Sequence, residues 1–268
     1  MKYITFNSGC AYAGLANLLE VRGVDTTDRK IALDMGLPYL FAREGDHFLS
    51  GPMLQSAAWF ALYLQPLGLR LKEVAISREN LSTYLQESDP CMLGLLVAPQ
   101  NKHAVIFTGM EDGHFCFLNN RWEQSDEPDT LTFGCCELSE RVDETVMVAA
   151  LEPVVAEKVD RRHLLEQSLT VLEELLAEIR LFCTVEQSPE AQFSALNRLF
   201  RPLLLDGITM LELIGKNDLA FRLKELQSQL LTALRGRQSC VLSEYLELDA
   251  LDKAALDYAG LIRKELEK

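Results

Sequence analysis

The stretch His103-Ala-Val-Ile-Phe-Thr-Gly-Met-Glu-Asp-Gly-His-Phe-Cys-Phe-Leu-Asn119 carries the strongest local structural signal of the chain. It begins with a β-branched and apolar run, and its centre holds the Asp-Gly pair that favours a tight hairpin turn. We therefore expect two strands paired across a turn at 111–113. The full set of expected strands is 69–76, 91–97, 103–110, 114–118 and 144–148, with a loop at 98–102, and it predicts an antiparallel sheet.

Helical patterns come before this sheet. Apolar residues recur with helical spacing from Ala11 to Leu19, Ser8 is a suitable N-cap and Gly23 a suitable terminating residue. These signals predict a helix over 10–22. Shorter helices are expected at 27–35, 53–64 and 78–87. Helices combined with an antiparallel sheet indicate an α+β domain.

The pattern changes after Pro153, where amphipathic helices follow one another without a strand signal. Leucines recur with helical spacing over 163–182, and further helices are expected at 189–205, 218–234 and 246–266. We expect the chain from Arg161 onward to be entirely helical and to form a bundle. The expected domains are therefore an α+β domain at 1–153 and a helical bundle at 154–268.

The composition is that of a globular protein with an acidic surface. The 268 residues are 48% hydrophobic, and 26 Lys and Arg against 40 Asp and Glu leave a net charge of −14. Such a surface repels nucleic-acid phosphates and anionic lipid, so neither nucleic acid nor a membrane is an expected partner. The N-terminal residues do not resemble a signal peptide, and seven widely spread cysteines fit reduced thiols, so we expect a cytoplasmic location. Without paired CxxC motifs or a Gly-rich phosphate loop, no metal and no cofactor is expected.

Three residues could together carry nucleophilic chemistry. Cys10 opens the first expected helix, where unpaired N–H groups and the positive end of the helix dipole favour a thiolate. His103 begins a strand and could take the thiol proton, and Asn119 ends the next strand and could orient the imidazole ring. Taken singly, each residue also has an ordinary interpretation. Cys10 would then be a small buried side chain, His103 a structural histidine and Asn119 a turn residue.

Gly9-Cys10 at a helix start, the His103-Ala-Val-Ile-Phe-Thr-Gly segment and Phe115-Cys-Phe-Leu-Asn119 carry a family resemblance. On these residues the first ~150 positions resemble the papain-like cysteine peptidase clan. The likeness is to the bacterial peptidases that cut bacteriocin leaders after a double glycine. Residues 10–41 are also similar to the N-terminal domain of the butirosin-biosynthesis acyltransferase family. The resemblance implies a papain-like fold in which Cys10 is the nucleophile, His103 the general base and acid, and Asn119 the orienting residue.

The chain departs from the family at two positions. Asn119 stands where the double-glycine peptidases usually have an Asp, and Ile4 stands where the clan has the Gln of its oxyanion hole. The Cys10 backbone N–H is one remaining oxyanion donor, and Asn7 or Tyr3 could supply a second. One such donor is worth about 10²–10³ in rate, so a protein of this fold that has lost its activity is a second interpretation.

The sequence thus predicts a cysteine-dependent acyl-transfer enzyme, either a hydrolase or an acyltransferase. Its substrate would be a peptide, an acyl-carrier thioester or a small amide. Two alternatives stay open: a catalytically inactive module that binds a peptide or protein, and a structural oligomer. Surplus leucine faces in the helical domain would favour a homodimer. His47, in a polar loop that could border a cleft, and His114, after the hairpin turn, are minor candidates for a role.

Overall fold

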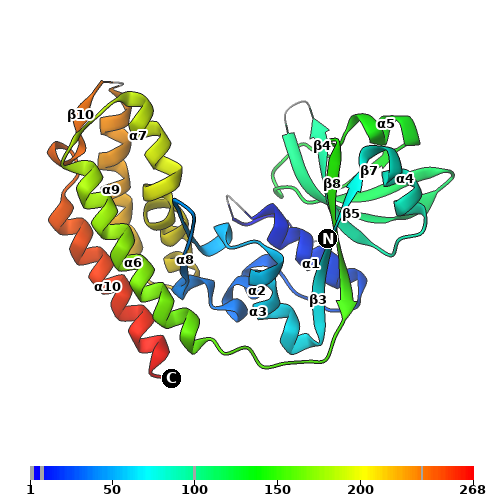
Figure 1. Ribbon diagram of the computed structural model, residues 1–268, viewed down its shortest axis with the longest axis horizontal. Coiled ribbons are helices and arrows are strands. Elements are labelled where there is room, and N and C mark those ends of the chain that lie inside the picture. The colour runs from blue at the N-terminus through cyan, green and yellow to red at the C-terminus, as the bar shows by residue number, and fades with distance from the viewer. Residues whose placement is uncertain (1–2, 7–8, 99–100, 237) are drawn as a thin grey trace. The chain divides into compact units, whose positions relative to one another are not determined.

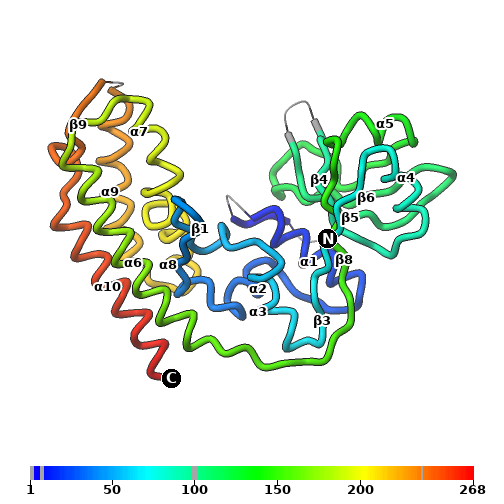
Figure 2. The backbone as a smooth tube through the Cα atoms, viewed as in Figure 1, coloured from blue at the N-terminus to red at the C-terminus, as the bar shows by residue number. Residues whose placement is uncertain are grey.

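The computed structural model describes residues 3–6, 9–98, 101–236 and 238–268. The chain forms two compact units, whose elements are labelled in Figure 1 and traced in Figure 2. The sheet unit comprises Met1–Met35 and Gln55–Val159, and the helical unit comprises Gly36–Leu54 and Asp160–Lys268. This division differs from the expected one at 153/154, because Gly36–Leu54 packs with the C-terminal helices instead of the sheet.

Three helices form the N-terminal part of the sheet unit: α1 (Cys10–Val21), α2 (Asp28–Met35) and α3 (Ala57–Leu64). The predicted helix over 10–22 is confirmed. Its N-cap is Gly9, while Ser8, the expected cap, lies outside the described residues. Gly23 has a φ of 81°, the left-handed conformation that ends a helix. The helix expected from 53 begins later, at Ala57, because residues 51–53 form a separate 3-10 turn.

The sheet unit is built on six antiparallel strands in the order β3-β8-β4-β5-β6-β7. Their bounds are β3 (Leu69–Ser77), β4 (Cys91–Ala98), β5 (Asn101–Glu111), β6 (His114–Asn119), β7 (Thr130–Phe133) and β8 (Thr145–Pro153). The predicted hairpin is confirmed, since Asp112 and Gly113 have φ values of 49° and 77°, as a type I′ turn requires. The α+β class is confirmed as well.

Two strands differ from the expectation for the same reason, which is pairing with a distant strand. β8 was expected to end at 148 but extends to Pro153, because its whole length pairs with β3. β7 was not expected at all. It is a four-residue strand in which Leu131 and Phe133 are buried, and it forms because β6 offers its free edge.

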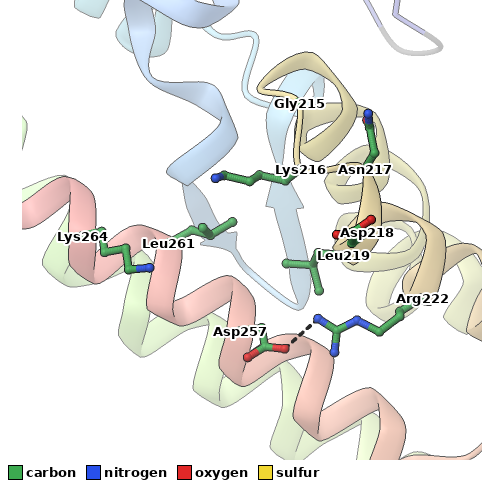
Figure 3. A pocket seen from close by; sticks show the side chains of 9 residues that line it. All are labelled: Gly215, Lys216, Asn217, Asp218, Leu219, Arg222, Asp257, Leu261 and Lys264. Atoms are coloured by element: carbon green, nitrogen blue, oxygen red, sulfur yellow. Dashed lines mark hydrogen bonds and ion pairs between the residues drawn. The ribbon is translucent and has the colours of Figure 1, made fainter.

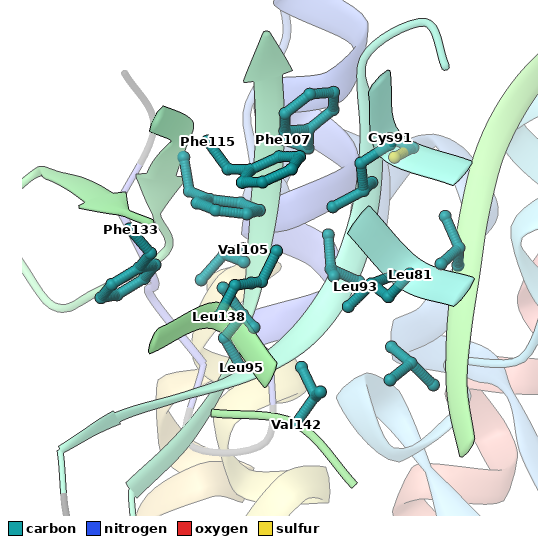
Figure 4. Close-up of a cluster of buried hydrophobic side chains, with 14 of the residues drawn as sticks. Leu81, Cys91, Leu93, Leu95, Val105, Phe107, Phe115, Phe133, Leu138 and Val142 are labelled. Carbon is teal, nitrogen blue, oxygen red and sulfur yellow. The ribbon is translucent and has the colours of Figure 1, made fainter. Parts of the chain in front are cut away.

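One face of the sheet packs under α4 (Arg78–Gln86) and the short helix α5 (Cys135–Glu140). Aromatic and aliphatic side chains of β4 to β7 meet leucines of the two helices there, as Figure 4 shows for Phe107, Phe115 and Leu138. Met92 alternates with the residues of this core and contacts α1 near Gly14, so α1 lies on the opposite face. The sheet is thus covered on both faces.

The helical unit contains α6 (Arg162–Cys183), α7 (Pro189–Ala195), α8 (Gly207–Leu213), α9 (Asn217–Arg235) and α10 (Leu248–Leu266). Two π-helical segments at 196–200 and 202–206 join α7 to α8. The expectation of an entirely helical region is wrong at one place, where β9 (Glu186–Gln187) pairs with β10 (Cys240–Val241). The buried Gln192 amide donates to the carbonyls of Gln187 and Gln238, which holds these two connecting segments beside each other.

The segment Gly36–Leu54 forms a hairpin, β1 (Phe41–Glu44) and β2 (His47–Ser50), inside the helical unit. The buried Ser168 hydroxyl of α6 accepts a hydrogen bond from the Phe41 N–H (2.8 Å) and donates one to the Tyr39 carbonyl (2.7 Å). Tyr258 of α10 donates to the Pro38 carbonyl (2.9 Å).

Among the described residues, no helix is both long enough and apolar enough to cross a membrane.

Candidate functional site

Cys10 is the first residue of α1, and its side chain is half-buried. The Gly9 carbonyl accepts hydrogen bonds from the N–H groups of Tyr12 and Ala13, at 3.0 and 3.2 Å, which closes the first turn. The N–H groups of Cys10 and Ala11 come before these bonds and have no partner within the helix, and they lie at the positive end of the helix dipole, which favours an anion at this place. Among the described residues, Cys10 makes no hydrogen bond, so its thiol is not bonded directly to His103.

His103 and Asn119 lie together at the ends of two neighbouring strands. The His103 Nδ1 is 3.1 Å from the Asn119 Oδ1, and the Asn119 side chain is fully buried. The Asn119 Nδ2 donates to the Glu127 Oε2 and to the Pro128 carbonyl, each at 3.1 Å. All polar atoms of the Asn119 amide are therefore engaged.

The partners of Asn119 determine the tautomer of His103. A backbone carbonyl can only accept a hydrogen bond, and so can an ionised carboxylate. The Asn119 NH₂ group must then face Pro128 and Glu127, and its oxygen must face His103. Because that oxygen can only accept, the proton of a neutral His103 ring is on Nδ1. The free lone pair, which is the basic site of the ring, is on Nε2.

Glu127 is a member of the site that the sequence analysis missed. Its Oε2 is 3.3 Å from the His103 Nδ1, and the side chains of His103 and Glu127 are 14% and 23% exposed. The only sequence signal was a polar stretch between Asn119 and β7, which is ordinary for a loop. The proximity arises from the way this loop folds back, which no local pattern reports.

A buried asparagine pair joins the helix of Cys10 to the strand of His103. Asn17 of α1 donates to the Asn120 Oδ1 (2.7 Å), and the Asn120 Nδ2 donates to the Ala104 carbonyl of β5. Both asparagines are fully buried. A Cβ on Gly14 of α1 would lie 2.8 Å from the Asn120 Nδ2, so the glycine allows helix and strand to approach this closely. This network sets the position of α1 on the sheet.

The oxyanion candidates lie around the N-terminal segment. The Ile4 side chain is buried, and its N–H donates to the Arg121 carbonyl (2.9 Å). The Tyr3 ring lies under the Arg121 guanidinium, 5.2 Å from its carbon, and is half-buried. Asn7 lies outside the described residues. Of the predicted donors, Tyr3 and the Cys10 N–H lie within the described residues, the latter at the start of α1.

The other histidines lie elsewhere. His47 begins β2 in the helical unit, is exposed and lies 3.5 Å from the Asp46 carboxylate. His114 is exposed after the hairpin turn, where its Nδ1 is 3.0 Å from the Asp112 carbonyl oxygen. Among the described residues, His114 makes no hydrogen bond or ion pair with His103 or Asn119. In the described ranges no group of three or more His, Cys, Asp or Glu side chains is arranged to hold a metal ion.

The helical unit has a polar pocket of its own, of about 510 Å³, between the start of α9 and the face of α10 (Figure 3). Lys216 and Lys264 line it, together with the ion pair between Arg222 and Asp257 (2.6 Å). None of the predicted site residues lines this pocket.

No protein-family model and no curated protein matches the chain. Among solved structures, the chain is similar to the peptidase domain of Streptococcus ComA, a bifunctional ABC transporter involved in quorum sensing. The two are 10% identical, with 55% of this chain and 95% of that chain covered and a TM-score of 0.38. It is also similar to a double-glycine-motif protease from an AMS/PCAT transporter, in complex with the leader peptide. Here the identity is 14%, the coverage 57% and 89%, and the TM-score 0.36.

Both of these solved structures are peptidases or peptidase domains of transporters. At these identities and TM-scores the likeness does not extend to activity or to individual residues.

Proposed function

We propose that the protein is a cysteine-dependent acyl-transfer enzyme in which Cys10 is the nucleophile, His103 the general base and acid, and Asn119 the residue that orients the ring. The Cys10 Sγ bonds to the carbonyl carbon of an amide or thioester while the His103 Nε2 takes the thiol proton. The bond to the leaving amine or thiol breaks, and Nε2 returns the proton to it. Water or an amine then attacks the enzyme thioester, gives a proton to Nε2 and releases the Cys10 thiol.

The hydrogen bonds of Asn119 are the observation that carries this proposal. They place the ring proton of neutral His103 on Nδ1 and leave Nε2 as the base. A histidine that served only to fill space would need no tautomer fixed by a fully buried amide. Together with a half-buried thiol at a helix N-terminus, this arrangement supports acid–base chemistry.

The oxyanion of the tetrahedral intermediate needs donors, and the Cys10 N–H is our first candidate. Asn7 remains our candidate for a second donor. Replacing Asn7 with Ala should then slow turnover by about 10²-fold without unfolding the protein. Unchanged turnover would remove Asn7 from the mechanism.

The substrate we propose is a peptide, in line with the leader peptide bound to one of the similar proteases. An acyl-carrier thioester and a small amide are the other substrate classes to test. We propose a cytoplasmic location, and a homodimer through the helical unit, where Leu181, Phe193 and Phe221 are exposed on helices.

A non-catalytic peptide-binding module is the second candidate function. The observation that favours it is the buried, apolar Ile4 side chain at the place of the oxyanion glutamine. Such a module would keep the fold and the cleft but not the reactivity of the thiol.

The two candidates differ in the reactivity of Cys10, and the chain contains a matched control. Cys135 also begins a helix, α5, and is exposed, and the proposal gives it no histidine partner. With iodoacetamide at about pH 6.5, followed by mass spectrometry, we expect Cys10 to alkylate at least about tenfold faster than Cys135. His103→Ala should bring the Cys10 rate down to that of Cys135. Equal rates in the unmodified protein would refute the enzyme proposal and favour the binding module.

A further inference from the structure

We infer that Glu127 is a positioning residue of this site, whose carboxylate holds Asn119 in place and stabilises the cationic form of the His103 ring. The inference rests on the proposed function, because the cationic ring arises when Nε2 takes the Cys10 proton. The role we infer for Glu127 is electrostatic, and no proton passes between its carboxylate and the ring.

The geometry assigns two contacts to one carboxylate oxygen. The Glu127 Oε2 accepts from the Asn119 Nδ2 at 3.1 Å and lies 3.3 Å from the His103 Nδ1. Both ionisable side chains are largely withdrawn from solvent, at 14% and 23% exposure. An ion pair in such surroundings is screened less than one between fully exposed side chains. Loss of the Glu127 charge should therefore have a measurable effect on the electrostatic environment of the His103 ring.

The loop that carries Glu127 is held by hydrogen bonds of its own. The Arg121 side chain donates to the Asp129 carboxylate and to the carbonyls of Trp122, Glu123 and Ser125. The Ser125 hydroxyl accepts from the Glu127 N–H (3.2 Å). At the far end, the Asn119 N–H donates to the Asp129 carbonyl (2.8 Å). The carboxylate is thus presented by a folded loop, which reduces the entropy lost on making the contact.

Two basic side chains of this region, among the described residues, pair with other carboxylates. The Arg121 guanidinium pairs with Asp129, and the neighbouring Lys102 pairs with Asp143. In the described part of the chain, Glu127 is the acidic side chain within ion-pair distance of His103. The Cys10 thiol on α1 is the other titratable group of the site. When the Cys10 proton moves to Nε2, the His103 ring becomes a cation, and the Cys10 thiolate and the Glu127 carboxylate are the two negative charges that balance it.

The test compares Glu127→Gln with Glu123→Gln, which removes the same charge from an exposed position of the same loop. Two quantities are measured: the rate of Cys10 alkylation by iodoacetamide, and the ¹⁵N and ¹H NMR signals of the His103 ring. We expect Glu127→Gln to slow alkylation by about tenfold and to shift the Nδ1–H signal, since the ring loses an opposite charge. Glu123→Gln should change neither. Wild-type rates and signals in both variants would overturn the inference.

Glu127→Asp separates charge from packing. This variant keeps the negative charge on a shorter side chain and should recover part of the alkylation rate lost in Glu127→Gln. If Asp is no better than Gln, the role of Glu127 is only structural and the inference fails. The NMR signals also distinguish this inference from the proposed function. An unreactive Cys10 in the unmodified protein refutes the enzyme proposal, while a His103 signal that changes in Glu127→Gln still demonstrates the contact.

Discussion

Gly14→Ala tests the packing of the helix that carries Cys10. A Cβ at this position would lie 2.5 Å from the Met92 Sδ and 2.8 Å from the Asn120 Nδ2, both shorter than a normal contact. The Met92 side chain is flexible and can move aside. The Asn120 amide cannot move freely, because its oxygen accepts from Asn17 and its nitrogen donates to the Ala104 carbonyl. The helix must therefore shift or the hydrogen bonds must lengthen.

The size of the effect follows from two opposing contributions. Overpacking of a core costs about 1–3 kcal/mol, and Ala in place of Gly inside a helix stabilises by about 1 kcal/mol. We expect Gly14→Ala to lower the free energy of unfolding by up to about 2 kcal/mol. Gly260 in α10 is the matched control, since a Cβ there meets nothing within 4 Å. Gly260→Ala should stabilise by about 0.5–1 kcal/mol.

Urea unfolding can report the two units separately. Both tryptophans, Trp59 and Trp122, belong to the sheet unit, so fluorescence follows that unit. Far-UV circular dichroism is dominated by the long helices of the helical unit. Gly14→Ala should lower the fluorescence midpoint, and Gly260→Ala should raise the dichroism midpoint. A Gly14→Ala variant with a raised fluorescence midpoint would refute the close packing of α1 on Asn120.

Three further predictions concern single side chains. Burial raises the pKa of the Cys91 and Cys183 thiols to about 12, so both should resist labelling with a disulfide reagent until urea unfolds the chain; labelling in the native state would contradict this. Burial also raises the pKa of the Asp206 carboxyl above its usual 3.8, against the opposing hydrogen bond from Arg201. The protonated Asp206 carboxyl therefore contributes its full stability below pH 3.8, and this contribution is lost as the pH rises through the raised pKa. In Asp206→Asn, the urea midpoint should fall less steeply with pH above pH 3.8. An unchanged dependence of the midpoint on pH would contradict this prediction. Ser168→Ala leaves the Phe41 N–H and the Tyr39 carbonyl without this partner and should lower the free energy of unfolding followed by dichroism by about 1–3 kcal/mol while the fluorescence transition stays unchanged; a shift in fluorescence alone would contradict this.

Much of the secondary structure could be predicted because its signals are local. The Asp112-Gly113 turn and the apolar strands beside it occur as expected, and so does the helix that Cys10 opens. The leucine spacing over 163–182 corresponds to α6. Within the site, the His103 and Asn119 side chains lie within hydrogen-bond distance, since they stand near the start and at the end of the paired strands of one hairpin.

The features that the sequence did not predict depend on contacts between distant segments. β7 forms against the edge of β6. β9 pairs with β10, although α7, α8 and α9 lie between these two strands in the sequence. The sequence pattern after α2 predicts a loop over Gly36–Leu54, but the apolar residues of this segment are buried beside α6 and α10. Burial of Phe41 and Phe48 decides this placement, and no local pattern reports which helices will cover them.

By itself, the sequence determined the helix that Cys10 opens and the central hairpin, and it put a thiol, an imidazole and an amide near the ends of these elements. Turn chemistry and hydrophobic spacing act over a few residues, so they can be read along the chain. The tertiary structure alone decided that Glu127 lies beside His103 and that the orientation of Asn119 puts the ring proton on Nδ1. Hydrogen bonds, here those of Arg121, select one conformation of this loop among many. These bonds join groups that come close together only when the chain has folded.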